Sequence, residues 1–265
     1  MGKIIGVLSL KGGVGKTSTV VALGAALTSF GKKVLLIDGN LSAPNLGIHL
    51  NLIDPENTLH HVLDEKKHAK DAIYTQKGID IIPASIFNRT KVNPLKLKDK
   101  IKLLRKKYDL IIIDSSPALN EETLAVMLAS DKILIVTTPD LPTLSTTMKA
   151  TRLAKNRGTP IIGLVINKVY NKHFELKAKE IENVAGVPVM AVIPHDINIL
   201  KSLSEFEPST TYKPHSKASH EYKKLASTII GEKYIPIKLR TLFKWINPSK
   251  QDVNRTIYYE SMFKH

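Results

Sequence analysis

The glycine-rich run KGGVGKTS at residues 11–18 constrains the fold of this chain more than any other feature of its sequence. It directly follows a short apolar segment, residues 4–8, which is typical of a buried strand. A buried strand that turns through glycines into a helix leaves several backbone N–H groups directed at one point, and proteins hold phosphate groups in this way. The run therefore predicts a site for a nucleoside triphosphate at the end of the first strand.

Each residue type in this run has a role in such a site. Glycines let the backbone approach oxygen atoms closely, Lys16 can reach the β- and γ-phosphates, and the hydroxyl of Thr17 can ligate Mg²⁺. The run departs from the ordinary P-loop pattern G-x-x-x-x-G-K-[ST], because Leu10 stands where its first glycine would be and a second lysine, Lys11, follows. The predicted nucleotide-binding residues here are Gly12, Gly13, Val14, Gly15, Lys16, Thr17 and Ser18.

Seven short apolar runs rich in β-branched residues recur along the chain. They are Ile4–Leu8, Val34–Ile37, Ile79–Ile82, Leu110–Ile113, Ile133–Val136, Ile161–Val165 and Val189–Ile193. Because helix-length segments separate them, they predict a parallel sheet covered on both faces, that is, a doubly wound α/β fold. Ligands gather at the carboxyl ends of the strands in this fold, so polar residues that follow these runs are candidates for the site.

The length and composition fit one compact domain. The chain has 265 residues, 43% of them hydrophobic and 24% charged, which is enough to bury a sizeable core. The absence of cysteine excludes disulfides, thiolate metal sites and cysteine nucleophiles. The first apolar stretch carries the glycine-rich run and none approaches the length of a membrane span, so we expect no signal peptide and no transmembrane helix.

The run at residues 10–18 resembles the deviant Walker A motif, xKGGxGKT[ST], of the MinD/ParA family of ATPases. The resemblance covers roughly residues 3–231, and we predict an ATPase domain at 1–231 followed by a basic tail at 232–265. It implies a doubly wound P-loop fold that binds ATP or ADP with Mg²⁺ and forms a homodimer on ATP binding. Lys11 would be the family's early lysine, which reaches across the dimer interface to the partner's nucleotide and acts in catalysis with Lys16.

Two acidic residues that end apolar runs match the family's magnesium-binding positions. Asp38 would help to hold the hydration shell of Mg²⁺, and Asp114, in a Walker B arrangement, would bind the ion through a water molecule. The bacterial pattern has a second aspartate two residues after the first, where this chain has Asn40. An amide can position the attacking water but cannot take its proton, so hydrolysis is expected to be slow or absent. A polar turn and a helix cap are the alternatives.

Two further segments resemble the parts of the family that bind the base. The run at 161–166 is followed by Asn167, whose amide can both donate to and accept from adenine. Downstream, Pro194, His195 and Asp196 match an Ile-Pro-x-Asp turn that lines the base. The alternative is that all four are ordinary loop residues.

The tail contains a short basic amphipathic pattern at about residues 238–246. Leu239, Leu242, Phe243 and Ile246 repeat at helical spacing, and Trp245 suits the boundary between lipid headgroups and acyl chains. Such a helix can lie in an anionic membrane surface, and MinD-like proteins carry a C-terminal anchor of this kind. The alternative is a helix that packs on the surface of its own domain.

Charge favours a different partner. The formal net charge is +15, and residues 89–107 hold nine Lys or Arg against one acid, Asp99. Leu97, Ile101, Leu104 and Tyr108 form an apolar stripe within this segment, so the lysines are expected on the outer face of a helix. Such a face is either simply solvated or attracts a polyanion, as in ParA relatives that bind DNA without sequence preference.

The sequence as a whole predicts a MinD-like ATPase. It would be cytoplasmic and peripheral on the inner face of the cell membrane, where an ATP-dependent dimer positions machinery for cell division or another spatial process. The alternative is a ParA-like DNA-binding ATPase for chromosome or plasmid segregation. Bacterial tyrosine kinases share the P-loop and phosphorylate a cluster of tyrosines near their C-terminus. This chain matches that cluster with Tyr258 and Tyr259 alone, which disfavours the kinase class.

Overall fold

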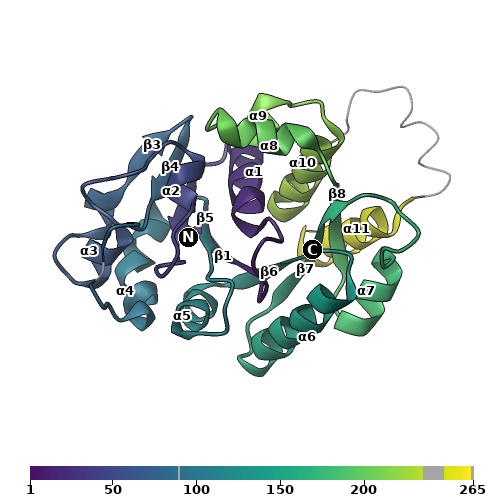
Figure 1. Ribbon diagram of the computed structural model, residues 1–265, viewed down its shortest axis with the longest axis horizontal. Helices are drawn as coiled ribbons and strands as arrows, with labels where there is room; N and C mark the ends of the chain where they lie inside the picture. Colours follow the sequence, from purple (N-terminus) through teal and green to yellow (C-terminus); the bar gives the residue numbers. More distant parts are fainter. Residues whose placement is uncertain (89, 235–247, 264–265) are drawn as a thin grey trace.

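An eight-stranded sheet forms the centre of the molecule (Figure 1). The computed structural model describes residues 1–88, 90–234 and 248–263. The strand order is β3-β4-β2-β5-β1-β6-β7-β8, and every neighbouring pair is parallel except β3 with β4. The strands are β1 Lys3–Leu8, β2 Val34–Asp38, β3 Tyr74–Gln76, β4 Ile79–Ile82, β5 Leu110–Asp114, β6 Lys132–Thr137, β7 Ile161–Val169 and β8 Val189–Pro194.

All seven predicted strands are present, and the doubly wound α/β architecture is confirmed. The strand that the sequence did not predict is β3, which pairs antiparallel with β4 at one edge of the sheet. Strand β7 continues to Val169, so Asn167 lies within the strand near its carboxyl end.

Helices cover both faces of the sheet (Figure 1). Helices α1, α8, α9 and α10 lie on one side, and α4, α5, α6 and α7 lie on the other. The α-helices are α1 Lys16–Ser29, α2 Leu46–His49, α3 Leu59–Leu63, α4 Leu97–Ile101, α5 Glu121–Ala129, α6 Leu141–Asn156, α7 Ala178–Ala185, α8 Ile197–Ser204, α9 Ser209–Tyr212, α10 Lys217–Ile230 and α11 Lys250–Phe263. The short 3₁₀ helices in the described part of the chain are η1 Ala69–Ala72, η2 Pro94–Lys96 and η3 Lys102–Lys106.

The core has two halves, one on each face of the sheet. Successive side chains of a strand point to opposite faces, so Ile4 and Leu8 of β1 join the half covered by α5 and α6. Ile5 and Val7 of the same strand join the half covered by α1 and α10. Burial on both faces explains why these strands read as continuous apolar runs.

The basic segment around α4 has the predicted inner stripe. Leu97, Ile101, Leu104 and Tyr108 are all buried, while most of the intervening lysines are exposed. The helix is interrupted, however, since α4 gives way to η3 after Ile101.

The last helix, α11, docks on the edge of the sheet beside β8 and α10 (Figure 1). Its Arg255 donates to the carbonyl oxygen of Met190, and the amide of Asn254 donates to that of Val189 at 2.8 Å. The helix thereby covers a strand edge that would otherwise expose unpaired backbone groups. The predicted amphipathic helix at 238–246 lies outside the described residues. Within them, no helix is long and apolar enough to cross a bilayer.

Candidate functional site

The glycine-rich run forms a tight turn between the carboxyl end of β1 and the first residue of α1. Gly13 and Gly15 have φ angles of 77° and 86°, a left-handed conformation that side chains other than glycine rarely adopt. A Cβ atom at Gly15 would lie 2.2 Å from the amide nitrogen of Asn167, whereas one at Gly13 would meet nothing within 4 Å. The loop is therefore packed against the protein at Gly15 and open in front of Gly13, where a phosphate can approach.

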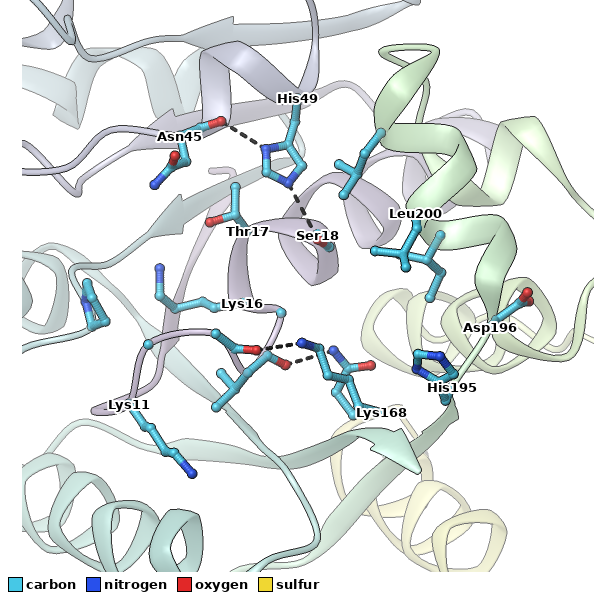
Figure 2. A pocket seen from close by; sticks show the side chains of 18 of the residues that line it. Lys11, Lys16, Thr17, Ser18, Asn45, His49, Lys168, His195, Asp196 and Leu200 are labelled. Atoms are coloured by element: carbon cyan, nitrogen blue, oxygen red, sulfur yellow. Dashed lines mark hydrogen bonds between the residues drawn. The ribbon is translucent and has the colours of Figure 1, made fainter. Parts of the chain in front are cut away.

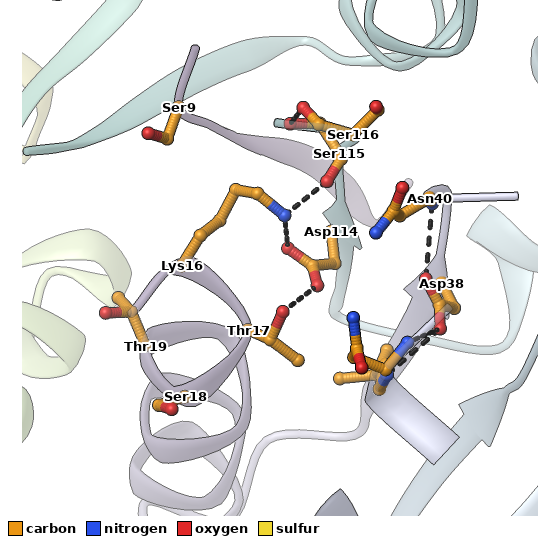
Figure 3. Close-up of polar contacts among 12 residues, drawn as sticks. Ser9, Lys16, Thr17, Ser18, Thr19, Asp38, Asn40, Asp114, Ser115 and Ser116 are labelled. Carbon is orange, nitrogen blue, oxygen red and sulfur yellow. Dashed lines mark hydrogen bonds and ion pairs between the residues drawn. The ribbon is translucent and has the colours of Figure 1, made fainter. Parts of the chain in front are cut away.

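Three of the predicted residues meet at the start of α1 (Figure 3). The ammonium group of Lys16 lies 2.5 Å from Oδ1 of Asp114 and also donates to the carbonyl oxygen of Ser115. The hydroxyl of Thr17 donates to Oδ2 of Asp114 at 2.6 Å. Lys16 and Asp114 are 7% and 1% exposed, so their charges balance each other away from water. A bound phosphate could replace Asp114 as the partner of Lys16, and a bound cation could replace Lys16 as the partner of Asp114.

Asp38 begins the segment that we call the switch loop, residues 38–45. Its carboxylate accepts hydrogen bonds from the backbone N–H groups of Asn40, Asn45 and Leu46 at 3.2, 3.1 and 3.0 Å. Asp38 is opposite Asp114 in the register of β2 and β5. Burial and the nearby Asp114 carboxylate raise the pKa of Asp38 to about 7.

This donor set fits Mg²⁺. Two buried carboxylates on adjacent strands repel each other when both are ionised, and a divalent cation between them would offset that repulsion. With the Thr17 hydroxyl they supply oxygen atoms only, which is the ligand type that Mg²⁺ prefers. Thr17, Asp38 and Asp114, the predicted metal residues, thus lie together.

Asn40 turns its side chain inside the switch loop. Its amide nitrogen donates to the carbonyl oxygen of Ala43. Its side-chain oxygen is buried and has no hydrogen-bond partner among the residues that the structure describes. Asn40 also lines the pocket in front of the glycine-rich loop, so this oxygen is available to accept a hydrogen bond from water.

Lys11 points away from the centre of the pocket (Figure 2). Its ammonium group donates to the hydroxyl of Thr143 at 2.6 Å and to Oδ1 of Asp140 at 3.2 Å, both at the start of α6. Burial would raise the pKa of Asp140, but the hydrogen bonds that it accepts from Thr138, Thr143 and Lys11 lower it to about 2. Lys11 is 40% exposed. The predicted contact with a partner's nucleotide stays a prediction.

The predicted base-binding residues line the other end of the same pocket, which has a volume of about 440 Å³ (Figure 2). The amide nitrogen of Asn167 donates to the carbonyl oxygen of Val14 at 2.8 Å, so its donor already holds the glycine-rich loop. His195 stacks on Tyr170 with ring centroids 4.4 Å apart. Asp196 caps α8 by accepting from the N–H of Asn198 at 2.9 Å. Pro194 completes this side of the pocket, and apolar residues of α8 close it.

The pocket residues that were not predicted from the sequence include His49, Lys168 and Tyr170. Lys168 adopts a φ of 57° and donates to the carbonyl oxygen of Gly13 at 2.7 Å. Its place directly after Asn167 was a usable signal. His49 lies 3.4 Å from the hydroxyl of Ser18, and burial lowers its pKa. No local pattern marks His49, because its position depends on how α2 folds over α1.

Comparison with known proteins agrees with this geometry. A family model described as an AAA domain matches residues 2–157. An uncharacterised ATP-binding protein of Methanocaldococcus jannaschii is 35% identical over 235 residues, which span 87% of this chain and 88% of that protein. The structure of the cell division ATPase MinD from Pyrococcus furiosus has a TM-score of 0.83 and 37% identity, and covers 87% of this chain and 99% of its own.

A second solved structure carries the ligands that the site predicts. MinD from Pyrococcus horikoshii, in complex with Mg-ADP, is 35% identical with a TM-score of 0.82, over 86% of this chain and 96% of its own. The folds, the relatives and the glycine-rich loop agree, and the chain belongs to the MinD/ParA family of deviant Walker A P-loop ATPases.

Proposed function

We propose that this protein is an ATP-dependent dimerisation switch that positions cellular machinery at the membrane. The observation that carries the proposal is the exposure of Lys11 together with its hydrogen-bond partners. This lysine belongs to the glycine-rich loop, yet it is 40% exposed, and among the described residues its ammonium group contacts Asp140 and Thr143 at the start of α6. An ion pair of this exposure contributes about 0–1 kcal/mol, so a nucleotide phosphate on a second copy can compete for the lysine.

Different residues would bind ATP, hold the metal and promote hydrolysis. ATP with Mg²⁺ supplies the phosphoryl group that is transferred to water. Lys16 would bind its phosphates, Thr17, Asp38 and Asp114 would hold the metal, and Lys11 of the second copy would add positive charge where negative charge develops. Asn40 can hold a water by its buried oxygen but cannot accept its proton, so we expect slow turnover that resets the dimer.

Membrane attachment rests on the sequence pattern at 238–246. Each dimer would bring two such segments to an anionic surface, and two weak contacts on one particle bind far more tightly than one. MinD of P. furiosus is described as a cell division ATPase. We therefore propose a cytoplasmic protein, peripheral on the inner face of the cell membrane, with a role in cell division or a similar spatial process.

Dimerisation is tested with Lys11→Ala. Light scattering after gel filtration measures the mass with ATP and with ADP, and the exposed Lys179→Ala variant is the matched control. We expect the wild type and the control to double in mass with ATP, and Lys11→Ala to stay monomeric while its nucleotide affinity is nearly unchanged. A dimer of the Lys11→Ala variant would overturn the assignment.

Membrane binding is tested by flotation with anionic liposomes. We expect ATP to increase flotation of the wild type, and the double variant Phe243→Glu, Ile246→Glu to lose it. Flotation of the double variant would show that these residues are not the anchor.

DNA is the second candidate surface, because of one specific observation. Lys98, Lys102, Lys106 and Lys107 are exposed on one basic segment, in a chain with a net charge of +15. ATP-dependent DNA binding without liposome binding, in parallel assays at the same salt concentration, would favour the ParA-like alternative.

A further inference from the structure

A second pocket, of about 690 Å³, lies behind the switch loop. The loop separates it from the nucleotide pocket, because Asn40 and Asn45 line the first pocket while Leu41, Ser42 and Pro44 line the second. A ligand in the second pocket would therefore touch the same loop from the opposite side.

The walls of this second pocket come from elements distant in sequence. His60 of α3 forms one part, the segment after β4 that includes Ser85 and Asn88 forms another, and the start of α5 forms a third. Helix α5 packs against α4 and η2. The pocket is thus built from regular elements of the fold as well as from the loop.

Glu122, at the start of α5, is the group that points to a ligand. It is 8% exposed. Its Oε1 accepts hydrogen bonds from the backbone N–H of Ser42, at 3.0 Å, and from the Ser42 hydroxyl. Its Oε2 is buried and has no hydrogen-bond partner among residues 1–88, 90–234 and 248–263. A buried carboxylate oxygen without a donor is unfavourable, so a donor from outside would be bound.

The neighbouring polar groups do not supply this donor. His60 accepts from the N–H of Ser85 at 3.2 Å and is also hydrogen-bonded to the backbone of Leu41. Burial lowers the pKa of His60, which favours the neutral ring. Asn120 uses its side-chain oxygen to cap α5. Lys91 is an exposed residue of the pocket lining, and Glu121 beside Glu122 adds a second negative charge.

We propose that this second pocket binds a cationic nitrogen group, an ammonium or a guanidinium, on Oε2 of Glu122. Both groups carry the N–H donors that this oxygen lacks, and both balance the charge of a carboxylate. The volume accommodates an extended polyamine or the side chain of an arginine.

Such a ligand would act on the switch loop. Glu122 holds Ser42 through Oε1, so a cation on Oε2 fixes the carboxylate and with it the back of the loop. Because Asp38 and Asn40 belong to this loop, cation binding and Mg-nucleotide binding would change each other's affinity by the same factor. This coupling rests on the proposed function, whereas the cation site itself does not.

The test is a titration followed by methyl NMR of the intact protein. Spermidine and N-acetylarginine amide are added separately, and N-acetylcitrulline amide serves as the uncharged match for arginine. The methyl groups of Leu41, Ile86 and Val92, which line the second pocket, report binding. We expect saturable shifts with at least one cation and none with the citrulline compound. Saturation by spermidine alone indicates a free polyamine, and saturation by the arginine compound alone indicates an arginine side chain.

Two glutamine variants make the test specific. Glu122→Gln removes the charge while its oxygen can still accept from Ser42, and Glu121→Gln removes the neighbouring exposed charge. We expect the dissociation constant to rise at least tenfold in the first and less than twofold in the second. Equal weakening in both, binding of the citrulline compound, or the absence of saturable shifts would overturn the proposal.

Two further variants separate this site from other effects. Arg89 stands between the lining residues Asn88 and Thr90 in the sequence, and Arg89→Ala should retain cation binding; its loss would overturn the proposal. Lys11→Ala should leave the titration unchanged even where it abolishes the dimer, so failure of the dimer and failure of this site are distinguishable.

Discussion

A buried arginine of α11, Arg255, takes part in the docking of this helix and makes the docking open to a quantitative test. Arg255 is 6% exposed. One of its terminal nitrogens donates to the carbonyl oxygen of Met190 at 2.9 Å and to Glu221 at 3.1 Å, and the other lies 2.5 Å from Asp252. Lys224 also contacts Glu221 and Asp252, at 3.2 and 3.3 Å. Arg255→Ala therefore leaves both carboxylates with a positive partner.

The expected loss follows from these contacts. The carbonyl oxygen of Met190 loses a charged donor, which costs about 1.5–3 kcal/mol. The packing of the arginine stem adds about 1 kcal/mol. We expect the free energy of unfolding to fall by about 2.5–4 kcal/mol. That is a large part of the roughly 5–15 kcal/mol of a typical domain.

Urea denaturation followed by circular dichroism measures this loss. Arg152→Ala on α6 is the matched control, because Arg152 is exposed and should change the free energy of unfolding by less than about 0.5 kcal/mol. Arg255→Lys keeps the positive charge but lacks the planar guanidinium group, so its loss in the free energy of unfolding should lie between those of Arg255→Ala and Arg152→Ala. If Arg255→Ala is as stable as the control, α11 is not docked as described.

Four smaller predictions concern the nucleotide site and the acid stability of the fold. Asp140→Asn should remove the ion pair of Lys11 and strengthen the ATP-dependent dimer about 2–5-fold in sedimentation equilibrium; an unchanged association constant would contradict this. Asn40→Asp should raise single-turnover hydrolysis about 10²-fold, because a carboxylate can take a proton; an unchanged rate argues against a water at this position. Lys168→Ala should weaken ATP binding about 2–10-fold by calorimetry, since the glycine-rich loop loses one hydrogen bond; equal affinity would exclude that role. Burial alone would raise the pKa of Asp252, but hydrogen bonds from Ser249 and Arg255 and the nearby positive charges outweigh burial and lower this pKa from 3.8 to about 2. The carboxylate therefore contributes about 1–2 kcal/mol to the free energy of unfolding, after allowing for its partial exposure; this contribution is complete above about pH 4 and is lost toward pH 2. Asp252→Asn should lack this dependence of stability on pH in acid titrations.

The central sheet was predictable because its signals are local. Each parallel strand is buried on both faces, so each is a short apolar run between helix-length segments. The carboxyl ends of such strands meet at one edge of the sheet, and Asp38 and Asp114 lie opposite each other there; their shared magnesium role was predicted from the resemblance to the family.

Strand β3 was missed because its own residues carry little signal. It has three residues, none of them buried, and among the described strands it pairs with β4 alone. The turn between the two strands did carry a signal. Lys77 and Gly78 both have positive φ angles, 51° and 77°, as in the two-residue turns that join antiparallel strands.

The docked position of α11 could not be read from an apolar stripe. Its fully buried residues, Asn254 and Arg255, are polar, and they are satisfied by backbone carbonyls of β8 and by carboxylates from other elements. Such burial depends on partners tens of residues away. The same reason applies to His49 and to the stacking of Tyr170 on His195 in the pocket.

The docking of α11 also changes how the proposed membrane segment would work. On the amino-terminal side of the proposed membrane segment, Tyr234 is hydrogen-bonded to His220 of α10 at 2.7 Å and packs on the ring of Phe30. On the carboxyl-terminal side of that segment, α11 packs against β8. The described residues on both sides of 235–247 are thus held by contacts to the rest of the protein. If ATP promotes membrane binding, it need not release this segment, because pairing two copies already doubles the number of segments on one particle. A covalently linked dimer should then bind anionic liposomes equally well with ATP and with ADP, whereas a segment that ATP must expose would keep its nucleotide dependence in that dimer.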